Sequence, residues 1–353
     1  MSKLFFILNG NNGATYILNA KSWSTISHSL KFYKPHALKS ELLKQGLRLY
    51  VWLLGKVGRF KLQDKAAITT MIGQKVNYPL DFDLDDNCSV LISPTKDKVI
   101  VNNHKHYFQK FAFGKSYANV KQESDIYKRL PLKSKAFQIS EIKDVQVVMG
   151  EFCSFKLCNS NTLISKPTDI KPVLVPVLTE FFQYSQSKET TCSNYLENLF
   201  AALDHAGLPD FRLCWSAEME TNYGAISWPL GLVHRDFKPW NVLSYQKPLI
   251  YDFEETVLDG PPLEDLFNYH IDPIIRYNSP EDVTAIIFAE CQINCYKEYL
   301  SHLNIHMTYK PFLIIYLLER ILFYNVSEEV ETSIKYTELF KYLILTENLK
   351  YGE

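Results

Sequence analysis

Residues 232–243 read LVHRDFKPWNVL, and residues 249–255 read LIYDFEE. These two stretches decide the fold, because each joins an apolar run suited to a short strand to a group of polar residues. Three oxygen-bearing side chains, Asp236, Asn241 and Asp252, lie beside these runs. A carboxylate next to an apolar run is costly to bury without a partner. The pattern therefore indicates a functional site rather than two ordinary turns.

Phosphoryl transfer needs the chemical groups that these residues carry. The reaction requires a carboxylate that accepts the hydroxyl proton and oxygen ligands that hold Mg²⁺ against the nucleotide phosphates. Mg²⁺ keeps waters and phosphate oxygens in its other positions, so one amide oxygen and one carboxylate suffice. Asp236, Asn241 and Asp252 can supply all three groups.

The order H-x-D-x-x-x-x-N, followed by an apolar strand and D-F, resembles the catalytic and metal-binding loops of the kinase-like phosphotransferases. The resemblance implies that Asp236 is the catalytic base and that His234 braces the loop. It implies that Asn241 and Asp252 are the Mg²⁺ ligands. Lys238 occupies the position of a lysine that contacts the transferred phosphate in eukaryotic-type kinases.

The residues after Asp252 favour one branch of this superfamily. Glu254 stands where protein kinases have Gly, and no A-P-E sequence closes an activation segment downstream. Residues 260–266 read GPPLEDL, which is similar to a short segment of the aminoglycoside phosphotransferase and choline kinase group. In that segment Asp265 resembles the residue that braces the catalytic loop from beneath. The resemblance therefore favours a small-molecule or glycan kinase over a Ser/Thr protein kinase.

The segment before residue 150 has strand and helix patterns of its own. Alternating apolar residues predict an antiparallel meander, then a helix that ends at Pro131, then a further strand. The expected ranges are strands over 89–92, 99–101, 107–113 and 145–149 and a helix over 117–130.

The resemblance assigns two charged residues in this segment to nucleotide binding. Lys110, on the third strand, resembles the lysine that neutralises nucleotide phosphates, and Glu123, on the helix, resembles its ion-pair partner. Two alternatives stay open. Lys105 or Lys115 could fill the lysine role, and Glu123 or Asp125 could be solvated helix charges.

The glycine-rich phosphate loop of the family is missing, and residues 93–98 read SPTKDK in its place. Backbone amides of a tight turn can still bind phosphate, and Ser93 and Thr95 would add hydroxyl donors. Side chains make close approach harder than glycine would. The last predicted strand leads to Glu151, where the resemblance implies a hinge whose backbone pairs with adenine.

Helical patterns dominate the chain beyond a loop at 153–176. The expected helices are 177–186, 193–206, 263–271, 281–302, 310–326 and 328–346. We therefore expect an α+β, bilobal protein-kinase-like fold with three parts. These are an N-terminal extension of hairpin and helix (1–87), a small antiparallel-sheet lobe (88–150) and a mainly helical lobe with the catalytic and metal-binding loops (151–353).

Composition limits the partners that the chain can have. Its 353 residues are 46% hydrophobic and 22% charged, which is typical of a globular protein and excludes global disorder. With 38 Lys and Arg against 39 Asp and Glu, the chain has no net positive charge that would attract nucleic acid. The apolar run at 312–318 is well short of the ~20 residues of a membrane span. The N-terminal apolar stretch is too short for a secretory signal, so we expect a cytoplasmic location.

These observations predict a phosphotransferase that uses ATP and Mg²⁺ and moves the γ-phosphoryl group to an alcohol group. The acceptor would be a small molecule, a sugar or a glycan, and no motif distinguishes among sugars, aminoglycosides and choline-like amines. One alternative is a non-catalytic kinase-like module that binds a nucleotide or a protein partner, which the missing glycines favour. Another is a Ser/Thr protein kinase. The oligomeric state is not indicated by the sequence.

Overall fold

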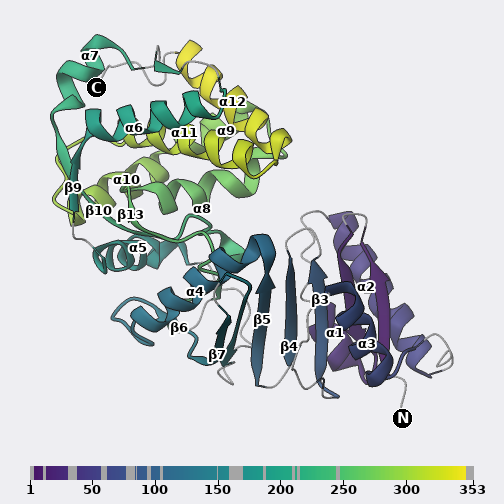
Figure 1. Ribbon diagram of the computed structural model, residues 1–353. Coiled ribbons are helices and arrows are strands. Elements are labelled where there is room, and N and C mark those ends of the chain that lie inside the picture. The colour runs from purple at the N-terminus through teal and green to yellow at the C-terminus, as the bar shows by residue number, and fades with distance from the viewer. Residues whose placement is uncertain are drawn as a thin grey trace. The chain divides into compact units, whose positions relative to one another are not determined.

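Seven strands of the described chain form one antiparallel sheet in its N-terminal part (Figure 1). The computed structural model describes residues 4–10, 13–30, 38–56, 62–76, 84, 86–93, 97–103, 106–148, 150–158, 170–185, 188–208, 211–212, 215–243 and 247–346. The strands, in their order across the sheet, are β1 (Phe5–Asn9), β2 (Thr15–Asn19), β3 (Cys88–Ser93), β4 (Lys98–Asn103), β5 (Tyr107–Phe113), β8 (Phe152–Cys158) and β7 (Ile142–Val148). The predicted meander of three strands is therefore present as β3, β4 and β5.

Helices cover both faces of this sheet. They are α1 (Trp23–Ser29), α2 (Leu38–Lys56), α3 (Lys65–Val76) and α4 (Tyr117–Arg129). Successive residues of a strand point to opposite faces. Phe111 of β5 therefore packs in the same core as Ile68 and Ile72 of α3, whereas Lys110 faces α4. The α4 helix ends where the sequence predicted, just before Pro131.

Contacts divide the chain into two compact units. Unit 1 consists of Met1–Leu132 and Ser140–Ile164, and unit 2 consists of Lys133–Ile139 and Ser165–Glu353. The hairpin and helix expected in residues 1–87 are present, and the hairpin continues the sheet because β2 pairs with β3. The boundary found at Ile164 lies beyond the position near 150 that the sequence suggested.

The hinge predicted at Glu151 is wrong. The Glu151 N–H donates to the carbonyl of Val148 at 3.0 Å, and Val148 pairs with Phe152, so this segment is the tight turn between β7 and β8. Gly150 has φ +77, a conformation that glycine adopts at little cost. The sequence missed β8 because its Cys and Ser residues resemble the composition of a loop.

Unit 2 is mainly helical and contains two small sheets of three strands each. The first sheet joins β13 (Val257–Gly260), β10 (Ser227–Val233) and β9 (Lys188–Thr191), and the second joins β11 (Val242–Leu243), β12 (Leu249–Ile250) and β6 (Gln138–Ile139). The helices are α5 (Leu174–Gln183), α6 (Cys192–His205), α7 (Ala217–Met219), α8 (Glu264–Ile275), α9 (Pro280–Ile287), α10 (Glu290–His302), α11 (Lys310–Val326) and α12 (Val330–Leu345). The predicted α+β class is therefore confirmed.

The α11 helix forms the centre of the helical unit, since its residues from Pro311 to Ile321 are buried. The single helix predicted over 281–302 is in fact two helices, α9 and α10. The break occurs because Ala289 has extended backbone angles, φ -62 and ψ 139. Within the described residues, no helix combines the length and the apolarity needed to cross a bilayer.

Strand β10 passes so close to α5 that position 231 requires glycine. A Cβ atom at Gly231 would lie 2.5 Å from the carbonyl oxygen of Phe182 and 2.7 Å from its ring. The strand leads directly into His234, so this contact positions the loop that follows.

Gly231→Ala should therefore lower the free energy of unfolding by about 1–3 kcal/mol, the usual cost of an overpacked site. Urea denaturation measures the change. Gly73→Ala in α3 is the matched control, because a Cβ there has no atom within 4 Å. Equal stability of the two variants would contradict the close packing of β10 against α5.

Candidate active site

His234 links two segments of unit 2 that are separate in the sequence. Its ring is buried, and its Nε2 atom lies 3.0 Å from the carbonyl oxygen of Tyr251. The Asp236 N–H donates to the Nδ1 atom of the ring at 3.3 Å. Burial lowers the pKa of His234, which favours a neutral ring with one donor and one acceptor nitrogen. The ring thus holds the start of the loop at 234–241 against the strand that precedes Asp252.

Asp265, in the first turn of α8, holds the same loop through its backbone. Its Oδ2 atom accepts the N–H of His234 at 2.8 Å, and its Oδ1 atom accepts the N–H of Arg235 at 2.9 Å. Arg235 has φ +63, the left-handed conformation that costs a non-glycine residue energy. Burial raises the pKa of Asp265 to about 8, and the two backbone donors oppose that increase. The resemblance in the sequence predicted that Asp265 braces the loop, and these two hydrogen bonds agree with that prediction.

Both carboxylate oxygens of Asp236 have fixed partners. The Asn241 amide nitrogen donates to the Asp236 carbonyl at 2.9 Å and to its Oδ2 atom at 2.6 Å. The Lys238 Nζ atom lies 2.5 Å from the Oδ1 atom. A carboxylate oxygen can accept more than one hydrogen bond. The side chain of Asp236 is 19% exposed, so it can still receive a hydroxyl group.

Asn241 directly precedes β11, and Asp252 follows β12 by two residues, so both lie at the same end of this antiparallel pair. Val242 pairs with Ile250, and the Tyr251 N–H donates to the backbone carbonyl of Asn241 at 3.2 Å. Because the amide nitrogen of Asn241 is used by Asp236, its amide oxygen is the atom suited to a cation. An amide oxygen and a carboxylate are the hard ligands that Mg²⁺ prefers. The donor set therefore fits this metal.

The ion pair predicted between Lys110 and Glu123 is present in unit 1. The Lys110 Nζ atom lies 2.8 Å from both carboxylate oxygens of Glu123, and the two side chains are 9% and 0% exposed. Glu123 is therefore not a solvated helix charge. Asp125 is one, because it forms a half-exposed pair with Lys121 of the same helix. Lys105 lies outside the described residues.

Of the other residues predicted to contact the nucleotide, Ser93 and Glu151 lie within the described part of the chain. Ser93 is the last residue of β3 and pairs with Lys98 across the β3–β4 hairpin. Thr95 lies outside the described residues. Glu151 is exposed in the β7–β8 turn, so it does not lie in a hinge as the sequence predicted.

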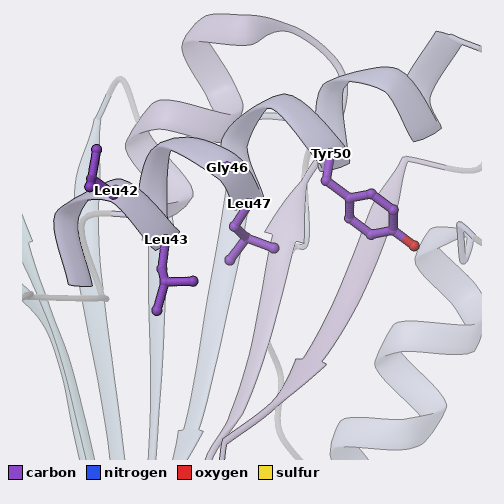
Figure 2. Close-up of a pocket in the computed structure, with 5 residues that line it drawn as sticks. All are labelled: Leu42, Leu43, Gly46, Leu47 and Tyr50. Atoms are coloured by element: carbon purple, nitrogen blue, oxygen red, sulfur yellow. The ribbon is translucent and has the colours of Figure 1, made fainter. Parts of the chain in front are cut away.

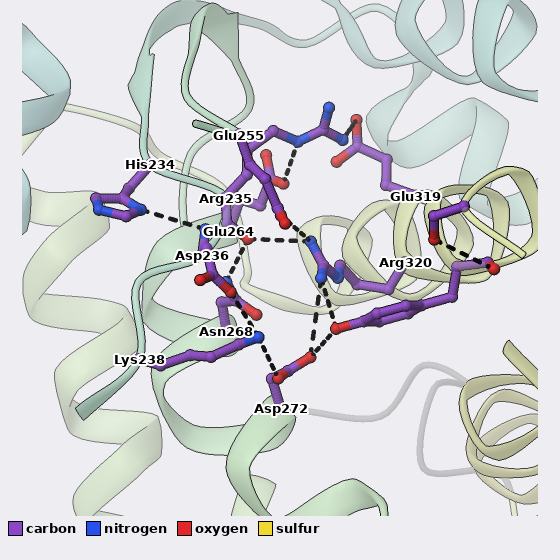
Figure 3. Close-up of polar contacts among 12 residues, drawn as sticks. His234, Arg235, Asp236, Lys238, Glu255, Glu264, Asn268, Asp272, Glu319 and Arg320 are labelled. Atoms are coloured by element: carbon purple, nitrogen blue, oxygen red, sulfur yellow. Dashed lines mark hydrogen bonds and ion pairs between the residues drawn. The ribbon is translucent and has the colours of Figure 1, made fainter. Parts of the chain in front are cut away.

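Sequence reasoning missed Asp272, which shares Lys238 with Asp236 (Figure 3). Its Oδ2 atom lies 2.8 Å from the Lys238 Nζ atom, and its Oδ1 atom accepts the hydroxyl groups of Tyr324 at 2.5 Å and Tyr336 at 3.0 Å. Burial opposes the charge on Lys238, but the Asp272 and Asp236 carboxylates together raise its pKa. Lys238 is therefore a cation held between two carboxylates.

A second charged residue that the sequence analysis missed is Arg320, buried in α11. Its guanidinium donates to the carbonyl of Arg235 at 3.0 Å and to the Tyr324 hydroxyl at 2.8 Å. It also lies 3.9 Å from Glu255, whose pKa is raised to about 7 by burial and by the nearby Asp236 carboxylate. Figure 3 shows that these contacts continue the network around Asp236.

Glu319, beside Arg320 in the sequence, belongs to the same buried cluster. It accepts the Tyr195 hydroxyl at 2.6 Å and lies 3.7 Å from Arg235, which also pairs with Glu264 at 2.9 Å. The signal for this cluster was visible in the sequence. Two charges directly after the apolar run at 312–318 would have been costly to bury without partners.

Comparisons with known proteins agree with the resemblance seen in the catalytic loop. Residues 175–296 match the family described as "Phosphotransferase enzyme family". This match confirms the sequence resemblance for the segment that contains Asp236, Asn241 and Asp252. No curated protein sequence matches the chain.

Solved structures with similar folds include aminoglycoside and macrolide phosphotransferases. The GDP and kanamycin complex of APH(2")-IIia is 14% identical, with a TM-score of 0.46 over 80% of this chain and 100% of that chain. A thermostable mutant of APH(4)-Ia with ADP and hygromycin B is 13% identical, with a TM-score of 0.40 over 81% and 100%. The macrolide 2'-phosphotransferase MphH from Brachybacterium faecium is 10% identical, with a TM-score of 0.37 over 77% and 97%. Likenesses of this size do not assign an activity to the chain.

Asp272→Asn should lower the free energy of unfolding by about 3–5 kcal/mol, because it removes one partner of the buried cations Lys238 and Arg320. Glu329→Gln is the matched control. Its pair with Arg276 has the same 2.8 Å separation as the Lys238–Asp272 pair, but both side chains are more than 40% exposed. That exposed pair should contribute at most about 1 kcal/mol. Equal losses of unfolding free energy in urea denaturation would show that burial does not strengthen the contribution of the Asp272 network to stability.

The buried carboxyl of Glu319 should make stability depend on pH. Burial, with a contribution from Glu264, raises its pKa to about 7. The pKa of an unfolded Glu is about 4.3. Between that pH and about pH 7, the folded chain therefore binds a proton that the unfolded chain has lost. The stability from that proton is complete below the lower pKa and is lost as pH rises through the higher one.

The advantage of native protein over Glu319→Gln in unfolding free energy should therefore fall between pH 5 and pH 8, by more than about 1 kcal/mol. Urea denaturation of both proteins across this range measures the difference, and the comparison cancels the other titrating groups. A difference that does not change with pH would contradict the raised pKa of Glu319.

Proposed function

We propose that the chain is a phosphotransferase that uses ATP and Mg²⁺ and transfers the γ-phosphoryl group to an alcohol group. The acceptor would be a small molecule, a sugar or a glycan. The observation that carries the proposal is the fixed carboxylate of Asp236, held at both oxygens by Asn241 and Lys238. Asn241 and Asp252 supply hard oxygen atoms at the same end of the β11–β12 pair, and the family match over residues 175–296 supports the same chemistry.

In this mechanism Asp236 orients the acceptor hydroxyl and takes its proton as the phosphoryl group is transferred. Asn241 and Lys238 keep the carboxylate in one orientation, which lowers the entropy cost of reaching a reactive geometry. Asn241 and Asp252 would hold Mg²⁺. The metal would neutralise charge on the phosphates of ATP, and ATP would supply the phosphoryl group. His234 keeps the loop in place and need not titrate.

In unit 1, Lys110 would contact the nucleotide phosphates, with Glu123 holding its ammonium group. Two features of the structure support this role: both side chains are buried, and the ammonium group lies 2.8 Å from each carboxylate oxygen. Ser93 and Thr95 would add hydroxyl donors to the phosphates. Glu151 is not part of this proposal, since the turn that carries it is not a hinge.

Two observations weigh against the alternatives. A non-catalytic module has no chemical need for Asp236, Asn241 and Asp252 together, yet the first two are in direct contact. A Ser/Thr protein kinase needs an activation segment after the metal-binding aspartate. Residues 253–263 form only β13 and its flanking turns before α8 begins at Glu264.

Asp236→Asn should reduce phosphoryl transfer by about 10²–10⁴-fold, the usual contribution of a positioned base, and should preserve nucleotide binding. The measurement follows radiolabelled γ-phosphate from Mg-ATP into the metabolite, glycan and protein fractions of a cell extract. Asp259→Asn, an exposed aspartate of the same unit, is the control for an altered charge. A fluorescent ATP analogue reports whether binding is retained.

Label in a small-molecule or glycan fraction, formed by the native protein and by Asp259→Asn but not by Asp236→Asn, would support the proposal. Label in the protein fraction alone would indicate a protein kinase. Equal transfer by the native protein and Asp236→Asn would remove Asp236 as the base. Absence of transfer by folded native protein that binds ATP would favour the non-catalytic module.

A further inference from the structure

Lys98 lies on the same face of the large sheet as Lys110. It is the first residue of β4 and pairs with Ala112 of β5, two residues beyond Lys110. Residues that pair directly across an antiparallel ladder share a face, and so do residues two apart in one strand. Diagonal neighbours of this kind are about 7–8 Å apart. Both ammonium groups can therefore reach one ligand that carries several phosphates.

The two faces of the sheet differ in their chemistry. On the face opposite to Lys98, the apolar side chains of β3 and β4 are buried in one core, namely Val90, Ile92, Val99 and Val101. On the face of Lys98, Leu91 pairs with Ile100, and both side chains remain partly exposed. In the described strands β3, β4 and β5, no acidic side chain lies on this face. The face therefore offers apolar surface beside two cations.

The turn that precedes Lys98 is tied to the end of β5. The Oδ2 atom of Asp97 accepts the N–H of Lys115 at 3.0 Å, and its backbone carbonyl accepts the N–H of Phe113 at 3.1 Å. A Cβ atom at Gly114 would lie 2.6 Å from the same Oδ2 atom, so the packing is close. Lys98 follows this fixed point and is 8% exposed. A cation that is already held in place loses little conformational freedom when it binds a ligand.

The apolar groove of unit 1 does not fit a phosphate ligand. Its lining residues all come from α2 and are Leu42, Leu43, Gly46, Leu47 and Tyr50 (Figure 2). None of these five residues carries a charge. The groove therefore offers no cation of its own, in contrast to the face that holds Lys98.

We propose that Lys98 binds the phosphates of a nucleoside triphosphate together with Lys110. This inference rests on the proposed phosphotransferase function and assigns a further residue to its nucleotide site. In a glycine-rich loop, backbone N–H groups contact the phosphates. Residues 93–98 contain no glycine, and the lysine at the end of this segment supplies a full positive charge instead. Partly exposed Leu91 and Ile100 favour a nucleotide over inorganic polyphosphate, because the nucleotide has a ring that can contact them.

Isothermal titration calorimetry of the full chain tests this role with a non-hydrolysable ATP analogue, tripolyphosphate and adenosine as probes. Lys98→Met should lose about 10- to 100-fold in affinity for the analogue, the range for a lost hydrogen bond between charged groups. Its affinity for adenosine should equal the native value. Added salt should weaken binding of the analogue less in Lys98→Met than in the native chain, because one charge is gone. Lys98→Arg keeps the charge and should retain most of the affinity.

The matched control is Lys65→Met. Lys65 is an exposed residue of α3, the helix that packs on the opposite face of the sheet through Ile68 and Ile72. The variant therefore carries the same chemical change away from the proposed site, and it should bind all three probes like the native chain. Urea denaturation verifies that each variant is folded.

Equal affinity of the native chain and Lys98→Met for the ATP analogue would overturn the role of Lys98 and leave the proposed function intact. Equal losses for the analogue and for adenosine would also overturn it, since they indicate a structural defect rather than a phosphate contact. Native chain that binds tripolyphosphate as tightly as the analogue would overturn the assignment of a nucleotide.

Failure of the proposed function gives a different result. A native chain that binds the analogue and shows the Lys98→Met loss, but transfers no phosphate to any acceptor, would support the role of Lys98 and contradict the phosphotransferase. Failure of the folded native chain to bind the analogue would overturn both.

Discussion

The rest of the site depends on two hydrogen bonds that the Asp265 carboxylate accepts from the backbone of the 234–241 loop. They fix the N–H groups of His234 and Arg235 and hold Arg235 at φ +63. A left-handed residue of this kind costs about 1–3 kcal/mol unless its surroundings determine it. Because Arg235 turns there, the next residue, Asp236, meets Asn241 and Lys238. A backbone contact thus sets the direction of the candidate base.

The loop also depends on a buried set of charges behind it. Lys238 lies between Asp236 and Asp272, and Arg320 joins the Arg235 carbonyl to the hydroxyl of Tyr324. Such groups are expensive to remove from water, and their mutual pairing offsets that cost only while every partner is in place. The arrangement therefore gives the loop one well-defined geometry. It also makes that geometry sensitive to the loss of any one member.

Local sequence patterns predicted much of the fold and part of the candidate site. The strand over 107–113 and the helix that ends before Pro131 could be read from alternation and from stop signals, and they place Lys110 against Glu123. The contacts of Asp272 and Arg320 could not be read this way, because they join α8 and α11 to the loop across long separations in sequence. The turn at Glu151 was mistaken for a hinge because polar residues in β8 hid its strand pattern.

Phosphorus NMR of ATP tests the central claim most directly, since it observes the γ-phosphoryl group itself. The sample contains the native chain, Mg²⁺ and a mixture of hydroxyl-bearing metabolites and sugars. The account predicts that the γ-phosphate signal falls while the signal of a new phosphate monoester grows, and that removing Mg²⁺ stops both changes. A γ-phosphate signal that broadens on binding but keeps its intensity, with every acceptor supplied, would contradict the account and indicate a protein that binds the nucleotide without transferring its phosphate.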